Sequence, residues 1–281
     1  MTITAPKRFL ESVEQSSEDR DSLVCVGLDP DLARMPDTIT RGRSAGDAIF
    51  EFNKQIIEST IEFAAAYKPQ LAMYMQYGPA GYEALLRTRE LIPSTTPAIL
   101  DCKIGDISTT MEPYARAYLD EADFDAITVN PYMGSECLQP VFDRAGKGAF
   151  LLCKTSNPGS GEIQNLTLEN GQPLFVEIAR KVAAWNAGSA ASLGLVVGAT
   201  YPAELIVVRE AVPDLLILVP GIGSQAGDLA AAVDAGIDGQ GRGLLINSSR
   251  SITFASAEKD FARASATAAR TLRDQINAIR G

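Results

Sequence analysis

Short hydrophobic runs recur along the chain, and each is followed by polar, Gly or Pro residues. The eight runs cover residues 23–28, 65–68, 98–102, 126–129, 149–153, 195–197, 216–219 and 244–247. Strands of a parallel sheet are covered on both faces, so they form continuous apolar runs and not alternating ones. The pattern therefore predicts eight buried parallel strands.

Between these runs, apolar residues recur at the spacing of a helix. The predicted helical stretches are 49–63, 174–185 after Pro173, 202–208, 229–233 and an Ala-rich amphipathic segment at 261–279. Strands that alternate with helices eight times predict an α/β fold of the (β/α)8 barrel type. A doubly wound open sheet is the alternative. No linker-like segment divides the chain, so we expect a single domain over residues 1–281.

Two polar segments lengthen the predicted barrel. Residues 31–47 are interrupted by Pro36, and residues 164–172 form the second segment. Both follow the end of a predicted strand, on the face where barrel active sites are built. We therefore expect inserted loops on the active face, with ordinary surface loops as the alternative.

Composition then removes several classes of function. The 281 residues contain no histidine, so Ser-His-Asp triads, Cys-His dyads and histidine metal sites within the chain are excluded. Lys and Arg total 25 against 35 Asp and Glu, which gives a net charge of −10. Nucleic acids require a basic surface, so they are not expected partners. A small phosphorylated ligand needs only a local site and stays possible.

The cysteines and the absence of long apolar segments bear on location. The four cysteines make no CxxC pair, and Cys25, Cys102 and Cys153 lie in apolar runs. We therefore expect buried free thiols and a cytoplasmic location, where thiols stay reduced. No apolar run approaches the roughly 18 residues of a membrane span. The first residues lack the apolar core of a signal peptide.

The third predicted strand end carries the sharpest chemical signal. Asp101 and Lys103 are two residues apart, so on an extended strand their side chains face the same side, and Asp106 follows in the loop. Lys68 stands at the second strand end. Buried charges are costly unless they pair, so these residues predict an alternating charge network beside a bound anion. A purely structural salt-bridge cluster is the alternative.

Other strand ends suggest a phosphorylated ligand with a polar ring. The segment PGIGSQAGD at 220–228 is Gly-rich and leads into a predicted helix, so its N–H groups could cradle an anion. Arg250 follows the eighth strand and could bind phosphate with two hydrogen bonds. Phosphate sites in such barrels often follow strands seven and eight. Ser156 begins the segment SNPG, whose short polar groups suit a planar ring or an ordinary turn.

Together these motifs resemble the orotidine 5′-phosphate decarboxylase family. DCKIGDI at 101–107 resembles the family signature D-x-K-x-x-D, and LDPD, YKPQ, TSNPG, PGIGSQAGD and INSSR match its other motifs in order. The resemblance runs from residue 23 to residue 252 and is greatest to the longer, type 2 subfamily. Ile104 is a departure, because members of that subfamily often have Arg there, and an apolar side chain cannot make the hydrogen bonds of that Arg.

The resemblance implies decarboxylation of orotidine 5′-phosphate to UMP in de novo pyrimidine biosynthesis, without a metal or an organic cofactor. It implies that Lys103 stabilises a C6 carbanion and then protonates it, and that Asp101 lies beside the substrate carboxylate. Lys68 would bridge Asp101 and the ribose hydroxyls, with Asp29 also on the ribose.

The resemblance also implies further contacts and a partner. Ser156 would bind the pyrimidine edge, while Gln225 and Arg250 would hold the phosphate under a closing loop. The chain would form a homodimer with shared active sites, in which Asp106 and Thr110 reach into the neighbouring subunit's site.

Three other functions compete with this hypothesis. A sugar-phosphate decarboxylase or aldolase of the same superfamily shares D-x-K-x-x-D but uses Mg²⁺, and its additional acidic and histidine residues are not evident. A Schiff-base aldolase would use Lys103 or Lys154 in an apolar setting, whereas Asp101 and Asp106 flank Lys103. A barrel that binds a nucleotide without catalysis would not need Asp101, Lys103 and Asp106 together.

Overall fold

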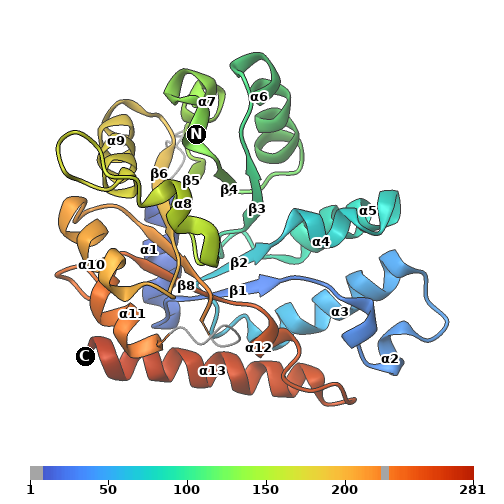
Figure 1. Cartoon of the computed structure of the whole chain (residues 1–281). Helices are drawn as coiled ribbons and strands as arrows, with labels where there is room; N and C mark the ends of the chain where they lie inside the picture. Colours follow the sequence, from blue (N-terminus) through green and yellow to red (C-terminus); the bar gives the residue numbers. More distant parts are fainter. Residues whose placement is uncertain (1–8, 223–227) are drawn as a thin grey trace, which may run out of the picture.

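The structure is a computed structural model that describes residues 9–222 and 228–281. It contains one sheet of eight strands in the order β2-β1-β8-β7-β6-β5-β4-β3, surrounded by helices (Figure 1). The strands are β1 Val24–Leu28, β2 Ala66–Pro69, β3 Ile99–Ile104, β4 Ala126–Val129, β5 Gly148–Lys154, β6 Ser192–Val197, β7 Ile217–Pro220 and β8 Leu244–Ser248. Each predicted apolar run corresponds to one of these strands, with ends that shift by at most a few residues.

The two ends of the sheet approach each other and nearly close it into a barrel. Parallel bridges join Tyr67 to Ala98 and Gln70 to Asp101, between β2 and β3. The backbone N–H of Tyr67 also donates to the carbonyl of Pro97 at 2.9 Å. The predicted (β/α)8 barrel is therefore confirmed, and the open doubly wound sheet is wrong.

The longer helices lie outside the strands. They are α1 Phe9–Arg20, α3 Ala45–Thr60, α5 Gly78–Leu91, α6 Ser108–Ala115, the π-helix η2 Arg116–Glu121, α7 Ser135–Phe142, α9 Leu174–Gly188, α10 Pro202–Ala211, α11 Leu229–Gly236 and α13 Phe261–Arg280. All five predicted helical stretches are confirmed. Helix α13 packs against α3, where Phe261 of α13 stacks on Phe52 of α3 with ring centroids 5.1 Å apart. Phe254, which follows α12, stacks on the same Phe52 ring at 5.3 Å.

Short helices occupy the turns between the main elements. They are η1 Leu32–Arg34, α2 Asp37–Thr40, α4 Leu71–Met75, η3 Pro131–Met133, η4 Pro158–Ser160, α8 Gly161–Gln164 and α12 Arg250–Thr253. The predicted insertion at 31–47 follows β1 and contains η1, α2 and the start of α3. The insertion at 164–172 follows β5 and turns back on itself, since Leu168 N–H donates to the carbonyl of Gln172 at 2.9 Å.

The apolar interior is divided between the space inside the barrel and the layer between strands and helices. Helix α1, which the hydrophobic pattern did not predict, closes the amino-terminal end of the barrel. Its Phe9 packs edge-on against Phe150, with centroids 5.8 Å apart. A Cβ on Gly148 would lie 2.3 Å from the Phe9 ring, so only glycine fits beneath this ring.

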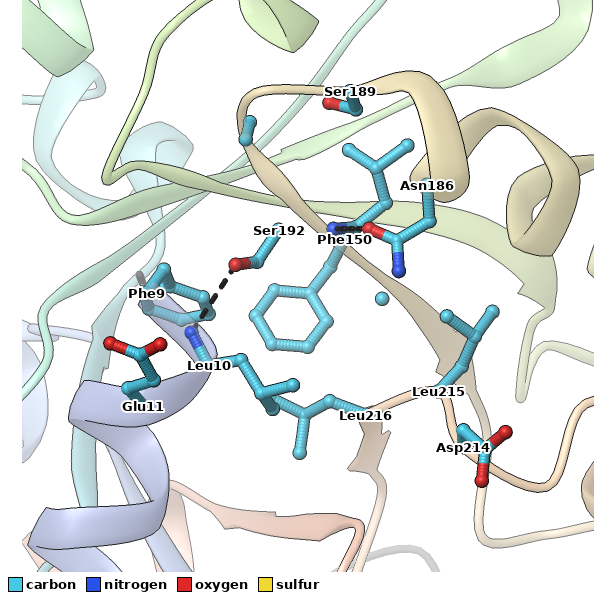
Figure 2. Close-up of a pocket in the computed structure, with 13 residues that line it drawn as sticks. Phe9, Leu10, Glu11, Phe150, Asn186, Ser189, Ser192, Asp214, Leu215 and Leu216 are labelled. Atoms are coloured by element: carbon cyan, nitrogen blue, oxygen red, sulfur yellow. Dashed lines mark hydrogen bonds between the residues drawn. The ribbon is translucent and has the colours of Figure 1, made fainter. Parts of the chain in front are cut away.

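A small cavity remains beside the start of α1, at the amino-terminal end of the strands (Figure 2). It has a volume of about 160 Å³ and is lined by residues that include Phe9, Phe150, Asn186 and Leu216. Because barrel active sites lie at the opposite, carboxyl-terminal end, this cavity is separate from the candidate site.

The cysteine prediction is confirmed at Cys25 and Cys153, which are buried free thiols. It is wrong at Cys102, which is only half-buried because β3 departs from regular pairing there. Cys137 is a further buried free thiol. Among residues 9–222 and 228–281, no helix combines the length and hydropathy that a membrane crossing demands.

Arg209 ties together the loops that enter β7 and β8. The side chain is 8% exposed, and its guanidinium donates to the carbonyls of Gly236, Val212, Pro213, Leu215 and Gly243 at 2.7–3.3 Å. Burial lowers the pKa of Arg209, and the nearby Asp238 and Asp214 oppose this effect. The residue thus satisfies carbonyl groups that would otherwise be buried without a donor.

We expect Arg209→Met to lower the free energy of unfolding by about 3 kcal/mol, because it leaves these carbonyls unpaired. Urea denaturation at a fixed protein concentration measures the change. Arg180→Met is the matched control, since Arg180 is exposed on α9 and its loss should change stability by less than about 0.5 kcal/mol. Equal stabilities of the two variants would contradict the role given to Arg209.

Candidate active site

The charged residues singled out in the sequence gather at the carboxyl-terminal ends of the strands. Lys68 lies in β2, Asp101 and Lys103 lie in β3, and Asp29 directly follows β1. Because all eight strands are parallel, their carboxyl ends open on one side of the barrel. The charge network is therefore built from neighbouring strands β1, β2 and β3.

The carboxylate of Asp101 is the centre of this network. Its Oδ2 accepts a hydrogen bond from Lys68 Nζ at 2.9 Å, and its Oδ1 accepts from Lys103 Nζ at 2.5 Å. Thr128 Oγ1 on β4 donates to the same Oδ1 at 2.9 Å. Lys68 is 3% exposed and Asp101 is 8% exposed, whereas the Lys103 side chain is 44% exposed. The lysine ammonium is thus presented to the open end of the barrel.

The ionisation of the buried pair follows from these contacts. Burial alone would raise the pKa of Asp101, but the charges of Lys68 and Lys103 and their hydrogen bonds hold this pKa well below its usual range. Burial would lower the pKa of Lys68, yet Asp101 and Asp29 raise it above its usual value. Both groups are therefore charged at neutral pH.

Lys103 reaches Asp101 by a different backbone path from the one the sequence predicted. Its φ angle is +49°, in the left-handed region, so β3 is not regularly extended at this residue. This conformation costs a residue other than glycine about 1–2 kcal/mol. The predicted meeting of the two side chains is confirmed, but strand alternation is the wrong reason for it.

Asp29 supplies an unpaired acceptor close to the network. Its Oδ1 is buried and has no hydrogen-bond partner among the described residues. The charge of Asp29 acts on Lys68, so the two residues share one electrostatic environment. A buried carboxylate oxygen without a donor is unfavourable unless a ligand supplies one.

Asp106 does not join the network of its own chain. Its Oδ1 accepts from the backbone N–H of Ile107 at 2.7 Å, and within the described residues no hydrogen bond or ion pair links it to Lys103. Thr110 lies farther along, in the first turns of α6, where it lines an apolar groove with Tyr82 and Tyr114. The expected acid–base–acid cluster is therefore incomplete within one chain.

Ser156 lies where the ends of β5, β6 and β7 approach one another. A Cβ on Gly198 would come within 2.7 Å of the Ser156 Cβ, so glycine is needed there. A Cβ on Gly221, whose φ is +103°, would lie 3.8 Å from the same atom. Strand ends distant in sequence thus meet at this half-buried serine.

The phosphate side of the predicted site is described only in part. Gln225 lies outside the described residues, as does most of the loop expected to close over the ligand. Arg250 is exposed at the start of α12, after β8. Asp228 caps α11 by accepting from the backbone N–H of Ala231 at 3.2 Å, so this carboxylate already occupies part of the helix start predicted to hold an anion.

Lys154, the other lysine considered as a nucleophile, is 1% exposed at the end of β5. Its Nζ donates to Ser160 Oγ at 2.7 Å and lies 4.6 Å from the centroid of the Tyr201 ring. Burial lowers its pKa, although Glu204 opposes the shift. Where the chain is described, no three Cys, Asp or Glu side chains gather as metal ligands would.

Thr128 is the residue of this site that sequence reasoning missed. It is 1% exposed and interrupts the apolar run of β4 with a hydroxyl group. Threonine is common in strands, so the hydroxyl gave no functional signal until the register of β3 and β4 was known.

Comparisons with known proteins agree with the geometry. The model of the family "Orotidine 5′-phosphate decarboxylase / HUMPS family" matches residues 22–265. A protein of Thermomicrobium roseum named orotidine 5′-phosphate decarboxylase is 50% identical over 273 residues, which are 97% of this chain and 96% of that protein. A protein of Herpetosiphon aurantiacus with the same name is 47% identical over 91% of this chain and 93% of its own length.

Solved structures agree as well. The OMP decarboxylase of Leishmania donovani superimposes with a TM-score of 0.84 at 38% identity, and the match covers 98% of this chain and 99% of that one. The UMP synthase of the same organism gives a TM-score of 0.86 at 39% identity. The match covers 97% of this chain but 56% of the synthase, so it extends over about half of that larger protein.

We expect Asp101→Asn to destabilise the protein by about 3–5 kcal/mol at neutral pH, because it leaves Lys68 as a buried charge without its partner. The lowered pKa of Asp101 means that its contribution exists above the ordinary carboxyl pKa and is lost as the pH falls. The stability gap between wild type and variant should therefore narrow below about pH 4.

Urea denaturation across this pH range tests the expectation. Asp234→Asn is the control, since Asp234 is exposed and makes no hydrogen bond or ion pair within the described part of the chain. If the difference in unfolding free energy between wild type and Asp101→Asn does not change with pH, the two lysines do not stabilise the ionised carboxylate of Asp101.

Proposed function

This chain belongs to the orotidine 5′-phosphate decarboxylase family and converts orotidine 5′-phosphate to UMP in pyrimidine biosynthesis, and we propose that Lys103 and Asp101 perform the chemical step. One observation carries this assignment. The Lys103 ammonium lies 2.5 Å from a carboxylate whose negative charge is maintained by Lys68. A fixed cation and a fixed anion thus adjoin at the open end of the barrel.

The proposed reaction needs only these side chains. The bond between C6 and the substrate carboxylate breaks, CO₂ leaves, and the electron pair stays on C6. This carbanion has no π-system over which to delocalise, so a positioned cation is the stabilising group available. Lys103 supplies that charge and then transfers one proton to C6, which forms the C6–H bond of UMP. The resulting amine regains its proton from solvent.

Asp101 has two proposed effects in this step. It orients Lys103 through their hydrogen bond, so the ammonium is held in place before the substrate arrives. It also places an ionised carboxylate beside the substrate carboxylate, and the repulsion between them is relieved when CO₂ departs. Since the depressed pKa keeps Asp101 ionised, this repulsion persists across the neutral range.

We propose the remaining contacts of the substrate from the places of four residues in the barrel or in its motifs. Asp29 has a buried oxygen without a donor beside Lys68, and a ribose hydroxyl would supply that donor. Ser156 meets the ends of β6 and β7, which suits the pyrimidine edge. Gln225 and Arg250 are proposed to hold the phosphate. The phosphate group of the substrate is remote from C6, so its binding energy can act through closure of the site.

A second copy of the chain is the proposed partner. Exposed apolar side chains follow β2, β3 and β4: Met73, Met75, Ile107, Tyr114, Tyr132 and Met133. This surface adjoins Asp106, whose carboxylate accepts from the backbone N–H of Ile107 and makes no hydrogen bond or ion pair with Lys103 among the described residues. An exposed apolar patch beside an incomplete site supports a homodimer in which Asp106 and Thr110 enter the other subunit's site.

We further propose that the chain is one domain with a cytoplasmic location. The single domain is supported by the eight strands, which share one sheet, and by the family model, which spans residues 22–265. The cytoplasmic location is supported by the four cysteines, all of which are free. Free thiols are typical of a reducing compartment.

We expect Lys103→Ala to lower kcat by at least about 10⁴-fold, because it removes both the fixed cation and the proton donor. The measurement follows the fall in absorbance as orotidine 5′-phosphate is consumed. Lys259→Ala is the control, since Lys259 is exposed and lies just before α13, outside the strands and their charge network. Undiminished turnover in Lys103→Ala, or a covalent adduct trapped by borohydride from wild type and substrate, would contradict the proposed step.

The shared site is tested by mixing two inactive variants, Lys103→Ala and Asp106→Ala. A heterodimer would contain one site with both residues intact, so random assortment should restore about a quarter of the wild-type sites. Activity is measured after subunit exchange has been verified with differently tagged chains. Exchange without any recovery would show that each chain uses its own Asp106.

A further inference from the structure

The pairing of β3 with β4 breaks at the reactive segment. The strands pair regularly up to Leu100 and Ile127, and they pair again at Ile104 and Val129. Three residues of β3 therefore lie opposite Thr128 alone. A bulge of this kind leaves backbone N–H groups without the carbonyl partners of a regular ladder.

The Thr128 hydroxyl takes the place of the missing ladder. Its Oγ1 accepts from the backbone N–H of Cys102 at 3.0 Å and from that of Lys103 at 2.9 Å. It donates to Asp101 Oδ1 at 2.9 Å, the oxygen that also accepts from Lys103 Nζ. A hydroxyl has one donor and two acceptor positions, so all of its capacity is used on this one segment.

We propose that Thr128 is a positioning residue for the decarboxylation. It holds the left-handed backbone at Lys103 and orients the carboxylate of Asp101, so that the ammonium and the carboxylate meet at one place and one angle. This proposal rests on the roles proposed above for Lys103 and Asp101. Thr128 itself touches neither the substrate nor the reacting carbon.

The position of Thr128 explains why water cannot replace it. The side chain is 1% exposed, and its Oγ1 receives the backbone N–H groups of both Cys102 and Lys103. Without the hydroxyl, β3 loses the contacts that offset a positive φ at Lys103. The ammonium then moves away from its working position, although the residues proposed for the ribose and the phosphate are unchanged.

Removal of the Thr128 hydroxyl should therefore slow the chemical step and leave substrate binding nearly unchanged. We expect Thr128→Val, which has nearly the same shape, to lower kcat by about 10- to 100-fold, the effect of a small misplacement of a catalytic group. KM for orotidine 5′-phosphate and Kd for UMP should change by less than about threefold. Thr128→Ser, which restores the hydroxyl, should return kcat to within about threefold of wild type.

Thr88→Val is the matched control. Thr88 is equally buried, its Oγ1 donates to the Ala84 carbonyl at 2.7 Å, and it accepts from Asn53 Nδ2 at 3.0 Å, but it lies on α5 away from Asp101. This variant loses stability and should keep the wild-type kcat. Thr128→Ala replaces Thr128→Val if the valine variant does not fold.

Wild-type turnover and its loss in Lys103→Ala test the proposed function separately. When both are observed, a wild-type kcat in Thr128→Val overturns the positioning role. The same holds if Thr128→Ser is as slow as Thr128→Val, or if a higher KM accounts for the whole loss in kcat/KM. A fall in kcat that serine reverses, with UMP binding retained, supports it.

Discussion

The negative charge of Asp101 inside the barrel is the constraint on which the site depends. A buried carboxylate is strongly unfavourable unless charged or polar donors surround it. Here Lys68, Lys103 and Thr128 provide three such donors. The same contacts that make the charge tolerable also hold a lysine ammonium in place, so the stability of the fold and the proposed chemistry have a common origin.

The apolar interior below this network strengthens it. Helix α1 and its Phe9 close the other end of the barrel, and buried apolar residues such as Ala66, Ile99 and Leu245 fill the space between. Burial raises the pKa of the Cys25 thiol to about 12, although Lys68 opposes that shift. The charges therefore act in surroundings of low polarity, where electrostatic interactions are stronger than in water.

The barrel explains why residues so far apart in sequence work together. Parallel strands present their carboxyl ends on one side, which brings β1, β2 and β3 together at the charge network and β5, β6 and β7 together at Ser156. The polar and charged loops can vary at that side without disturbing the apolar layers. The lack of histidine is no obstacle to this chemistry, since a lysine can both stabilise the carbanion and protonate it.

The sequence predicted the eight strands, five of the longer helices (α3, α9, α10, α11 and α13) and the grouping of charged residues at strand ends. These follow from local rules of apolar spacing and from short motifs. It did not predict helix α1, because its apolar residues Phe9 and Val13 are few and the surrounding segment is polar. Its expectation for Cys102 was wrong, because burial there depends on the register of β3.

How Asp101 and Lys103 meet depends on the tertiary structure. The spacing of two residues suggested regular alternation, whereas the structure has a bulge and a left-handed Lys103. The residue that sustains this geometry, Thr128, is 25 positions from Lys103 in the chain. A strand pattern reports which residues are buried, but the hydrogen bonds across a bulge depend on the register between two strands, and register is set by the packing of the whole barrel.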